Sequence, residues 1–229
     1  MRNVFLDSGP IITLATNNLL HLFEDYKKNN ELEFYITPEV KKEVVDNPIK
    51  TKKFRLEAYQ VLELIKKDII KIIKITKEDE LLTNRLINDI NKIYSANAKD
   101  VFIAHRGEIE IVAVALNRGK STLVVDERTT RQLVENPILI ANRMENKLHT
   151  KIHIDYKLME DIHKELSFLK VLRSVDLVSR AVELNYFKNF YDNKKTGKEF
   201  LEGMLWACKL KGCAVMDLEI DEYLKEVKL

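Results

Sequence analysis

Val4-Phe5-Leu6-Asp7-Ser8-Gly9-Pro10, near the start of the chain, is a short apolar run that ends at an acidic turn. A run closed by Asp, Gly and Pro is typical of a buried strand followed by a change of direction. Residues 11–23 then carry apolar side chains at helical spacing. The order of a strand followed by a helix recurs along the chain. Short strands are expected over residues 33–36, 69–75 and 121–125, with amphipathic helices between them. Strands separated by helices indicate a parallel sheet covered on both faces.

We therefore expect an α/β fold over residues 1–155, a three-layer α/β/α sandwich with a mainly parallel central sheet. The remainder of the chain differs in character. Its helical periodicity covers residues 156–169, 175–190, 197–210 and 218–227, and no convincing strand lies among these segments. The sequence thus predicts an α/β domain over residues 1–155 and an all-helical C-terminal extension or small domain over residues 156–229.

The composition argues against several classes of protein. The chain has 229 residues, 45% hydrophobic and 32% charged, and its net charge of +2 neither indicates nor excludes a nucleic-acid partner. Cys208 and Cys213 form an isolated pair, which argues against a zinc ribbon or a secreted disulfide scaffold and fits a reducing compartment. No apolar run approaches the roughly 20 residues that span a bilayer, and Asp7 interrupts any signal-peptide core. A cytoplasmic protein without a membrane partner is expected.

Acidic residues stand where the expected strands and helices meet. Asp7 ends the first strand and Asp126 ends the strand over residues 121–125, so both belong at the carboxyl edge of the sheet, where open parallel sheets bind ligands. Glu43 lies in the helix that starts at Thr37-Pro38, and Glu108 lies near the start of another helix. Taken alone, each Asp is better explained as a turn residue or a helix cap.

Four carboxylates from separate elements would repel one another strongly unless cations neutralised them. Mg2+ and Mn2+ take oxygen ligands and retain several waters, so a few carboxylates suffice to hold them. A pair of such ions can activate water and stabilise an in-line displacement at phosphorus. The acids together therefore favour a site for Mg2+ or Mn2+ at this edge of the sheet.

The same blocks of sequence resemble a PIN domain. The resemblance covers roughly residues 1–145, and its blocks are residues 4–12, residues 36–45, Gly107-Glu108 with the alanine-bearing helix that follows, and residues 123–128 with Arg131. It implies a metal-dependent nuclease that acts mainly on RNA through acids clustered at one sheet edge. Carried over position by position, the catalytic and metal-holding acids are Asp7, Glu43, Glu108 and Asp126.

The resemblance also implies supporting residues and partners. Ser8 would support the first acid, and Glu127 or Arg128 would assist near the fourth. The basic neighbours of the acids are the expected substrate contacts, with Arg131 preferred because it lies one turn after Glu127 and can pair with an acid or a phosphate. The expected substrate is RNA. The family includes ribosomal-RNA-processing nucleases and the toxin ribonucleases of toxin–antitoxin pairs, so an antitoxin-like or other protein and a second copy of the chain, as a homodimer, are further partners.

Two departures from the family pattern leave alternatives open. The fourth block reads Asp126-Glu127-Arg128 where many relatives place a second Asp, so whether Glu127 is a ligand stays open. The C-terminal segment lies outside the common domain. The runner-up hypothesis is accordingly a non-catalytic PIN-like module that binds RNA or protein, and a third is a structure-specific nuclease acting on DNA. A dehalogenase-type phosphatase is rejected, because Gly9 stands where that chemistry needs a second acid.

Overall fold

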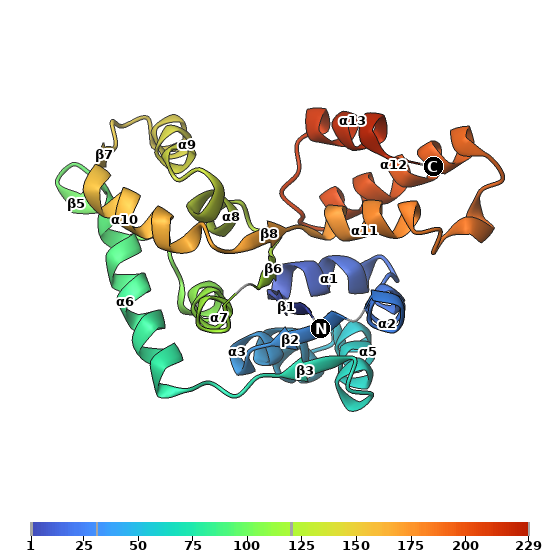
Figure 1. Ribbon diagram of the computed structural model, residues 1–229. Coiled ribbons are helices and arrows are strands. Elements are labelled where there is room, and N and C mark those ends of the chain that lie inside the picture. Colours follow the sequence, from blue (N-terminus) through green and yellow to red (C-terminus); the bar gives the residue numbers. More distant parts are fainter. Residues whose placement is uncertain (1, 31, 120, 229) are drawn as a thin grey trace.

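The computed structural model describes residues 2–30, 32–119 and 121–228 (Figure 1). Within these ranges the main sheet has five parallel strands in the order β3-β2-β1-β6-β8. The strands are β1 (Arg2–Leu6), β2 (Leu32–Ile36), β3 (Ile70–Ile72), β6 (Thr122–Val124) and β8 (Lys170–Leu172). The expected strands over residues 33–36, 69–75 and 121–125 correspond to β2, β3 and β6. The predicted α/β fold with a mainly parallel central sheet is confirmed.

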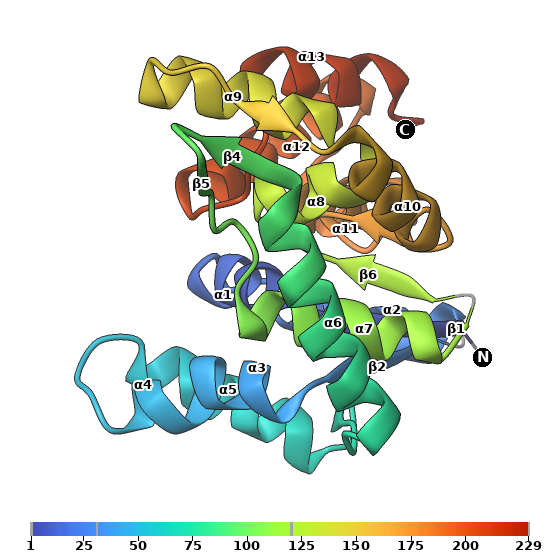
Figure 2. The same ribbon diagram turned by 90° about the vertical axis from the view of Figure 1, so that its left-hand side faces the viewer.

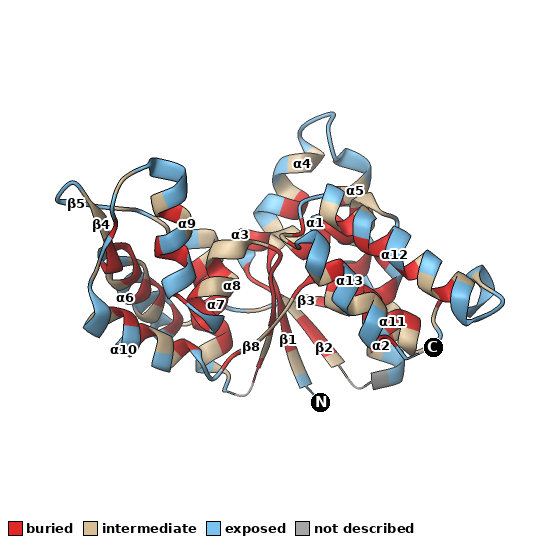
Figure 3. Cartoon of the chain, turned by 90° about the horizontal axis from the view of Figure 1, so that it is seen from above, coloured by how far each residue is buried: buried red, intermediate tan, exposed pale blue. Residues whose placement is uncertain are grey.

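Helices cover both faces of this sheet, which is the three-layer arrangement (Figure 3). One layer contains α1 (Ser8–Thr16), α2 (His21–Asn30), α5 (Arg55–Lys66), α11 (Ser174–Glu183), α12 (Lys194–Leu210) and α13 (Asp217–Glu226). The opposite layer contains α6 (Lys77–Ile93), α7 (Arg106–Asn117), α8 (Arg128–Glu135), α9 (Ile138–Leu148) and α10 (Tyr156–Leu166). Figure 2 shows this second layer from its outer side, with α6 and α7 next to each other.

The central strand is apolar because it is enclosed by both layers. Val4, Phe5 and Leu6 are all buried, and β1 pairs with β2 on one side and with β6 on the other. Its hydrogen bonds are therefore satisfied on both edges, and the chain leaves the sheet at Asp7. No helix in the described ranges is long and apolar enough to cross a membrane.

Short connecting elements complete the chain. After β2 come α3 (Pro38–Lys41), the π-helical turn η1 (Lys42–Asp46) and α4 (Asn47–Ile49), and a 3-10 turn, η2 (Lys188–Phe190), lies between α11 and α12. A small antiparallel sheet joins β4 (Tyr94–Ala96), β5 (Lys99–Asp100) and β7 (His153–Ile154). The helix expected over residues 11–23 is divided into α1 and α2, because Asn18 adopts a left-handed conformation with φ of 57°.

The prediction that residues 156–229 contain only helices was wrong. The segment supplies β8, which pairs in parallel with β6, and the Val125 N–H donates to the Leu172 carbonyl at 2.8 Å. The three residues of β8 lie between the helices expected over residues 156–169 and 175–190, and they are too few to show a period of two. The division at residue 155 stays a prediction, and a shortened chain tests it.

A chain that ends at residue 155 is expected to lose cooperative unfolding. Without β8, strand β6 becomes an exposed edge whose outer hydrogen bonds have no protein partner. The test compares the sharpness and the midpoint of the unfolding transition in the shortened chain and in residues 1–229. Both are measured by urea titration followed by circular dichroism. A sharp transition at an unchanged midpoint in the shortened chain would show instead that residues 1–155 fold independently.

Candidate active site

A pocket of about 230 Å³ lies beyond the carboxyl end of β1, and acidic side chains dominate its lining. The lining residues are Asp7, Ser8, Gly9, Glu43, His105, Gly107, Glu108 and Glu127. They come from the loop and first turn after β1, from η1, and from the starts of α7 and α8. We call this the acidic pocket. It brings together the predicted acids Asp7, Glu43 and Glu108, which are far apart in the sequence.

Asp7 is held in place by the elements on either side of it. Its backbone N–H donates to the Val124 carbonyl at 3.0 Å, and its Oδ2 accepts from the Gly9 N–H at 3.4 Å, so it caps α1. The side chain is buried, with 6% of its residue surface exposed. The pKa of Asp7 is raised to about 6, mainly by burial; the Ser8 and Gly9 backbone N–H groups act to lower the pKa, and the charges of Glu43 and Asp126 act to raise it. The contact of Ser8 with Asp7 is thus made by its backbone N–H.

Glu43 reaches the pocket from η1. The helix starts where predicted, with the Thr37 Oγ1 accepting from the Val40 N–H at 3.3 Å and Pro38 as its first residue. It then widens, and the Asn47 N–H donates to the carbonyl of Lys42, five residues back. The wider turn comes just before Pro48, whose ring would clash with a carbonyl in a regular α-helix. Insertions of this kind are frequent at functional sites.

Gly107 leaves room for the Glu43 carboxylate. A Cβ at this position would lie 3.0 Å from the Glu43 Oε1 atom, closer than side chains normally approach. Gly107 is in the first turn of α7. The absence of a side chain there lets the carboxylate of η1 approach the helix that carries Glu108.

Gly107→Ala is expected to weaken Mn2+ binding roughly tenfold while leaving the fold as stable or slightly more stable. Alanine stabilises a helix by about 0.5–1 kcal/mol relative to glycine, and the displaced atom is the end of a flexible side chain. Calorimetric titration with Mn2+ and thermal unfolding measure the two effects. Gly203→Ala, in α12, is the matched control, because no described atom lies within 4 Å of a Cβ there. Equal Mn2+ affinities for Gly107→Ala and the parent would contradict the role given to this glycine.

Glu108 experiences the charges of the other pocket acids. It is half-buried in the first turn of α7. Its pKa is raised to about 7, mainly by burial and in addition by the charges of Glu127, Asp7 and Glu43. The arrangement therefore carries unbalanced negative charge, which a cation would relieve.

Asp126 and Glu127 differ in where their side chains lie. Asp126 is 2% exposed, and its two carboxylate oxygens accept from the Thr13 hydroxyl and the Ser174 N–H, both at 2.8 Å. Glu127 lines the acidic pocket and caps α8, with its Oε2 accepting from the Thr130 N–H at 2.7 Å. Asp126 lies behind Gly9, whose Cβ would be 3.3 Å from the Asp126 Cβ. The sequence left open whether Glu127 is a ligand, and Glu127 is the residue of this pair that lines the pocket.

The predicted basic contacts are mostly engaged elsewhere. Arg131 lies 3.5 Å from the Glu219 carboxylate and 3.6 Å from that of Glu135, so its partners are acids outside the pocket. Lys41 pairs with Asp46 and Lys42 with Glu39. Arg128, at the start of α8, is half-buried and is not among the residues that line the acidic pocket.

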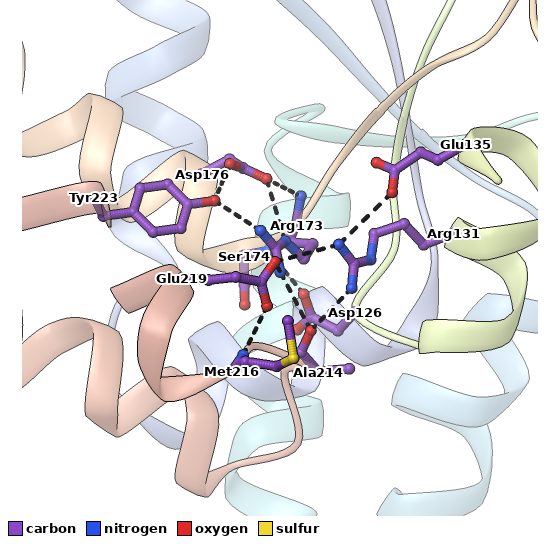
Figure 4. A network of polar contacts seen from close by, with 10 residues as sticks. All are labelled: Asp126, Arg131, Glu135, Arg173, Ser174, Asp176, Ala214, Met216, Glu219 and Tyr223. Atoms are coloured by element: carbon purple, nitrogen blue, oxygen red, sulfur yellow. Dashed lines mark hydrogen bonds and ion pairs between the residues drawn. The ribbon is translucent and has the colours of Figure 1, made fainter. Parts of the chain in front are cut away.

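A network from the C-terminal segment supports Asp126, and the sequence did not reveal it (Figure 4). The Ala214 N–H donates to the Asp126 carbonyl at 3.0 Å, and the Ala214 carbonyl accepts from Arg173 at 3.3 Å. Arg173 also bonds the Glu219 carboxylate at 2.8 Å, and the same carboxylate oxygen pairs with Arg131. These contacts join residues 41 or more positions apart, and no local sequence pattern pointed to them. The last third of the chain therefore helps to fix the end of β6.

The four acids of the pocket offer oxygen donors, which suits Mg2+ or Mn2+. Over the described part of the chain, no three His, Cys, Asp or Glu side chains are placed to hold a metal ion jointly. Mg2+ usually binds through one or two carboxylates and keeps several waters, so the lining of Asp7, Glu43, Glu108 and Glu127 meets its chemistry.

A comparison with protein families identifies the architecture. The family model described as DUF3368, a PIN domain, matches residues 3–139. The chain belongs to the PIN-domain family. The matched range contains every acid of the pocket, whereas β8 and the partners of Asp126 at residues 174 and 214 lie beyond it. PIN domains are generally nucleases, and this chain carries its acids at the carboxyl edge of the sheet, where open parallel sheets bind ligands.

Two solved structures share features of the fold. VapBC2 from Rickettsia felis, bound to a DNA fragment from its promoter, is 13% identical, with a TM-score of 0.45 over 75% of this chain and 98% of the other. VapBC-1 from nontypeable Haemophilus influenzae is 10% identical, with a TM-score of 0.43 and the same coverage. No curated protein matches the chain.

Proposed function

We propose that this PIN domain is a metal-dependent ribonuclease that hydrolyses phosphodiester bonds of single-stranded or structured RNA, with Mg2+ or Mn2+ at the acidic pocket. The observation that carries the proposal is the convergence of Asp7, Glu43, Glu108 and Glu127 on one pocket. Their mutual repulsion raises the pKa of Asp7 and Glu108 above ordinary values, in addition to the effect of burial. Acids brought together at such a cost are best explained by a cation that they hold.

Each acid has a distinct part in the proposed chemistry. One or two of Asp7, Glu43, Glu108 and Glu127 would hold the ion directly and the others through its bound waters. Asp126 would position the pocket from behind through Thr13 and Ser174. A bound divalent ion supplies activation of water and stabilisation of the charge that develops in an in-line displacement at phosphorus. Asp7 is oriented by its hydrogen bond as the N-cap residue of α1, and Glu127 is oriented in the same way as the N-cap residue of α8.

Cleavage of a labelled single-stranded RNA by the purified protein with Mn2+ tests the proposal. Glu43→Gln and Glu108→Gln are each expected to reduce the cleavage rate by on the order of a hundredfold or more, because each replaces a charged oxygen donor by a neutral amide. Asp192→Asn, an exposed change outside the pocket, is the matched control and is expected to cut normally. Absence of cleavage by the parent protein, or full activity of both Gln variants, would refute the proposal.

A non-catalytic module that binds RNA or protein is the second candidate. The observation in its favour is that Asp126, one of the four predicted ligands, has both carboxylate oxygens engaged by Thr13 and Ser174 and does not line the acidic pocket. Calorimetry with Mn2+ separates the two, because a catalytic site predicts a binding heat that Glu108→Gln weakens.

An antitoxin-like partner and a homodimer stay predictions, which co-purification and sedimentation would test. The same RNA assay run beside a matching DNA strand tests for a DNA-directed nuclease.

A further inference from the structure

A second pocket of about 550 Å³ adjoins the acidic pocket. The two share His105, Glu108 and Glu127 in their linings, so they form one continuous depression. We call the second part the α9 groove. It is lined by residues 101–103 of the loop before α7, by Thr129 of α8, and by Arg143, Met144, Lys147 and Leu148 of α9. A polymer whose reacting bond lies in the acidic pocket would have to continue beyond it, and the α9 groove offers such a path.

The α9 groove carries positive charge where the acidic pocket carries negative charge. Arg143 and Lys147 are four positions apart on α9, and therefore lie on the same face of that helix. The Arg143 Nη2 donates to the Thr129 hydroxyl at 2.7 Å, which leaves further guanidinium donors for a ligand. Lys147 is exposed and has no ion pair within the described ranges. Arg143 and Lys147 can therefore bind phosphates, which the neighbouring acids would repel.

An exposed aromatic ring completes the groove. Phe102 is 75% exposed, although the backbone beside it is fixed. The buried Asn91 accepts from the Ile103 and Ala104 N–H groups at 2.7 and 2.9 Å, and donates to the Ala104 carbonyl at 3.1 Å. The loop that carries Phe102 runs along α6 toward α7 (Figure 2). A rigid loop that presents a ring to solvent suits stacking on a planar group.

We propose that the α9 groove binds the RNA strand next to the bond that is cut, with Arg143 and Lys147 on phosphates and Phe102 stacked on a base. The inference rests on the proposed ribonuclease function and specifies where its substrate lies. Cations that follow a backbone, together with an aromatic that stacks bases, are the usual means of holding single strands without reading their sequence. An acidic peptide would satisfy the cations but would not explain the continuity with a pocket of carboxylates.

Fluorescence anisotropy with a labelled single-stranded RNA in EDTA measures binding without cleavage. Phe102→Ala is expected to raise Kd about tenfold without changing its salt dependence. Lys147→Ala is expected to raise Kd several-fold and to lower the slope of log K against log salt by about 0.7, the value for one phosphate contact on a single strand. The matched controls are Phe168→Ala, at a residue 77% exposed, and Lys28→Ala, at an exposed position on α2. Both controls are expected to bind like the parent.

The outcomes separate this inference from the proposed function. Normal RNA binding by Phe102→Ala and Lys147→Ala overturns the proposal that the α9 groove binds RNA, even when Glu108→Gln shows that cleavage depends on the acidic pocket. RNA binding that needs Phe102 and Lys147, in a protein that cuts no RNA with Mn2+, supports RNA binding in the α9 groove and overturns the proposed ribonuclease function. Absence of RNA binding, or tighter binding of the matching DNA strand, overturns the assignment of the groove to RNA.

Discussion

Asp7→Asn is expected to reduce RNA cleavage by on the order of a thousandfold or more and, at pH 8 without metal, to raise the stability of the fold by about 2 kcal/mol. The gain arises because the Asp7 carboxylate is charged at pH 8 in a buried site beside Glu43 and Asp126, where its pKa is raised to about 6. Asparagine removes that charge. Its side-chain oxygen can still accept from the Gly9 N–H, so the N-cap of α1 is kept.

The sign of the pH dependence follows from the raised pKa. The protonated form is favoured in the folded state, so the contribution of Asp7 to stability is full below its ordinary pKa of 3.8 and is lost as pH rises through about 6. Glu108, whose pKa is raised to about 7, acts in the same direction. Metal-free parent protein should therefore lose stability between pH 4 and pH 7, and Asp7→Asn should lose less.

Urea unfolding at pH 4 and pH 8 in EDTA measures this effect. The variant and parent should be nearly equal at pH 4 and should differ by about 2 kcal/mol at pH 8. Added Mn2+ should stabilise the parent more than the variant, since ligand binding favours the folded state. Asp192→Asn serves again as the control for the loss of a carboxylate. A parent protein as stable as Asp7→Asn at pH 8 would contradict the electrostatic account of the pocket.

Asp126→Ala is expected to lower the free energy of unfolding by about 3 kcal/mol, a larger loss than for any change within the acidic pocket. Asp126 accepts two buried hydrogen bonds, from the Thr13 hydroxyl and from the Ser174 N–H at the start of α11. Alanine leaves both donors buried without an acceptor, and it removes a negative charge from a helix N-terminus. The last third of the chain would thereby lose an attachment to β6.

Asp126→Asn separates a positioning role from direct contact with the ion. Its oxygen can accept from the Ser174 N–H and its amide can donate to Thr13, whose hydroxyl can rotate, so the expected loss is about 1 kcal/mol or less. If Asp126 only positions the pocket, this variant should keep its Mn2+ affinity and far more cleavage activity than Asp7→Asn. Loss of Mn2+ binding in Asp126→Asn, with the fold intact, would instead make Asp126 a ligand, as the family resemblance implied.

Local sequence was sufficient to place the first acids. The apolar run Val4-Phe5-Leu6 and the turn signal after it indicated a buried strand, which put Asp7 at the carboxyl edge of the sheet. Thr37 and Pro38 started a helix where the sequence predicted it, and Glu43 follows in η1 at the same edge. Capping and apolar periodicity act over a few residues, so a single sequence suffices to read them.

The tertiary structure decided which residue of the Asp126-Glu127 pair lines the pocket. Neighbouring side chains leave the end of a strand in different directions, and here Thr13 and Ser174, the latter 48 positions away, engage Asp126. Strand β8 and the α9 groove depend in the same way on contacts between distant segments. The sequence by itself thus determined the strands of the sheet before residue 155, their shared carboxyl edge and the acids near it. The division of labour among those acids required the packed chain, because it depends on hydrogen bonds that no local pattern encodes.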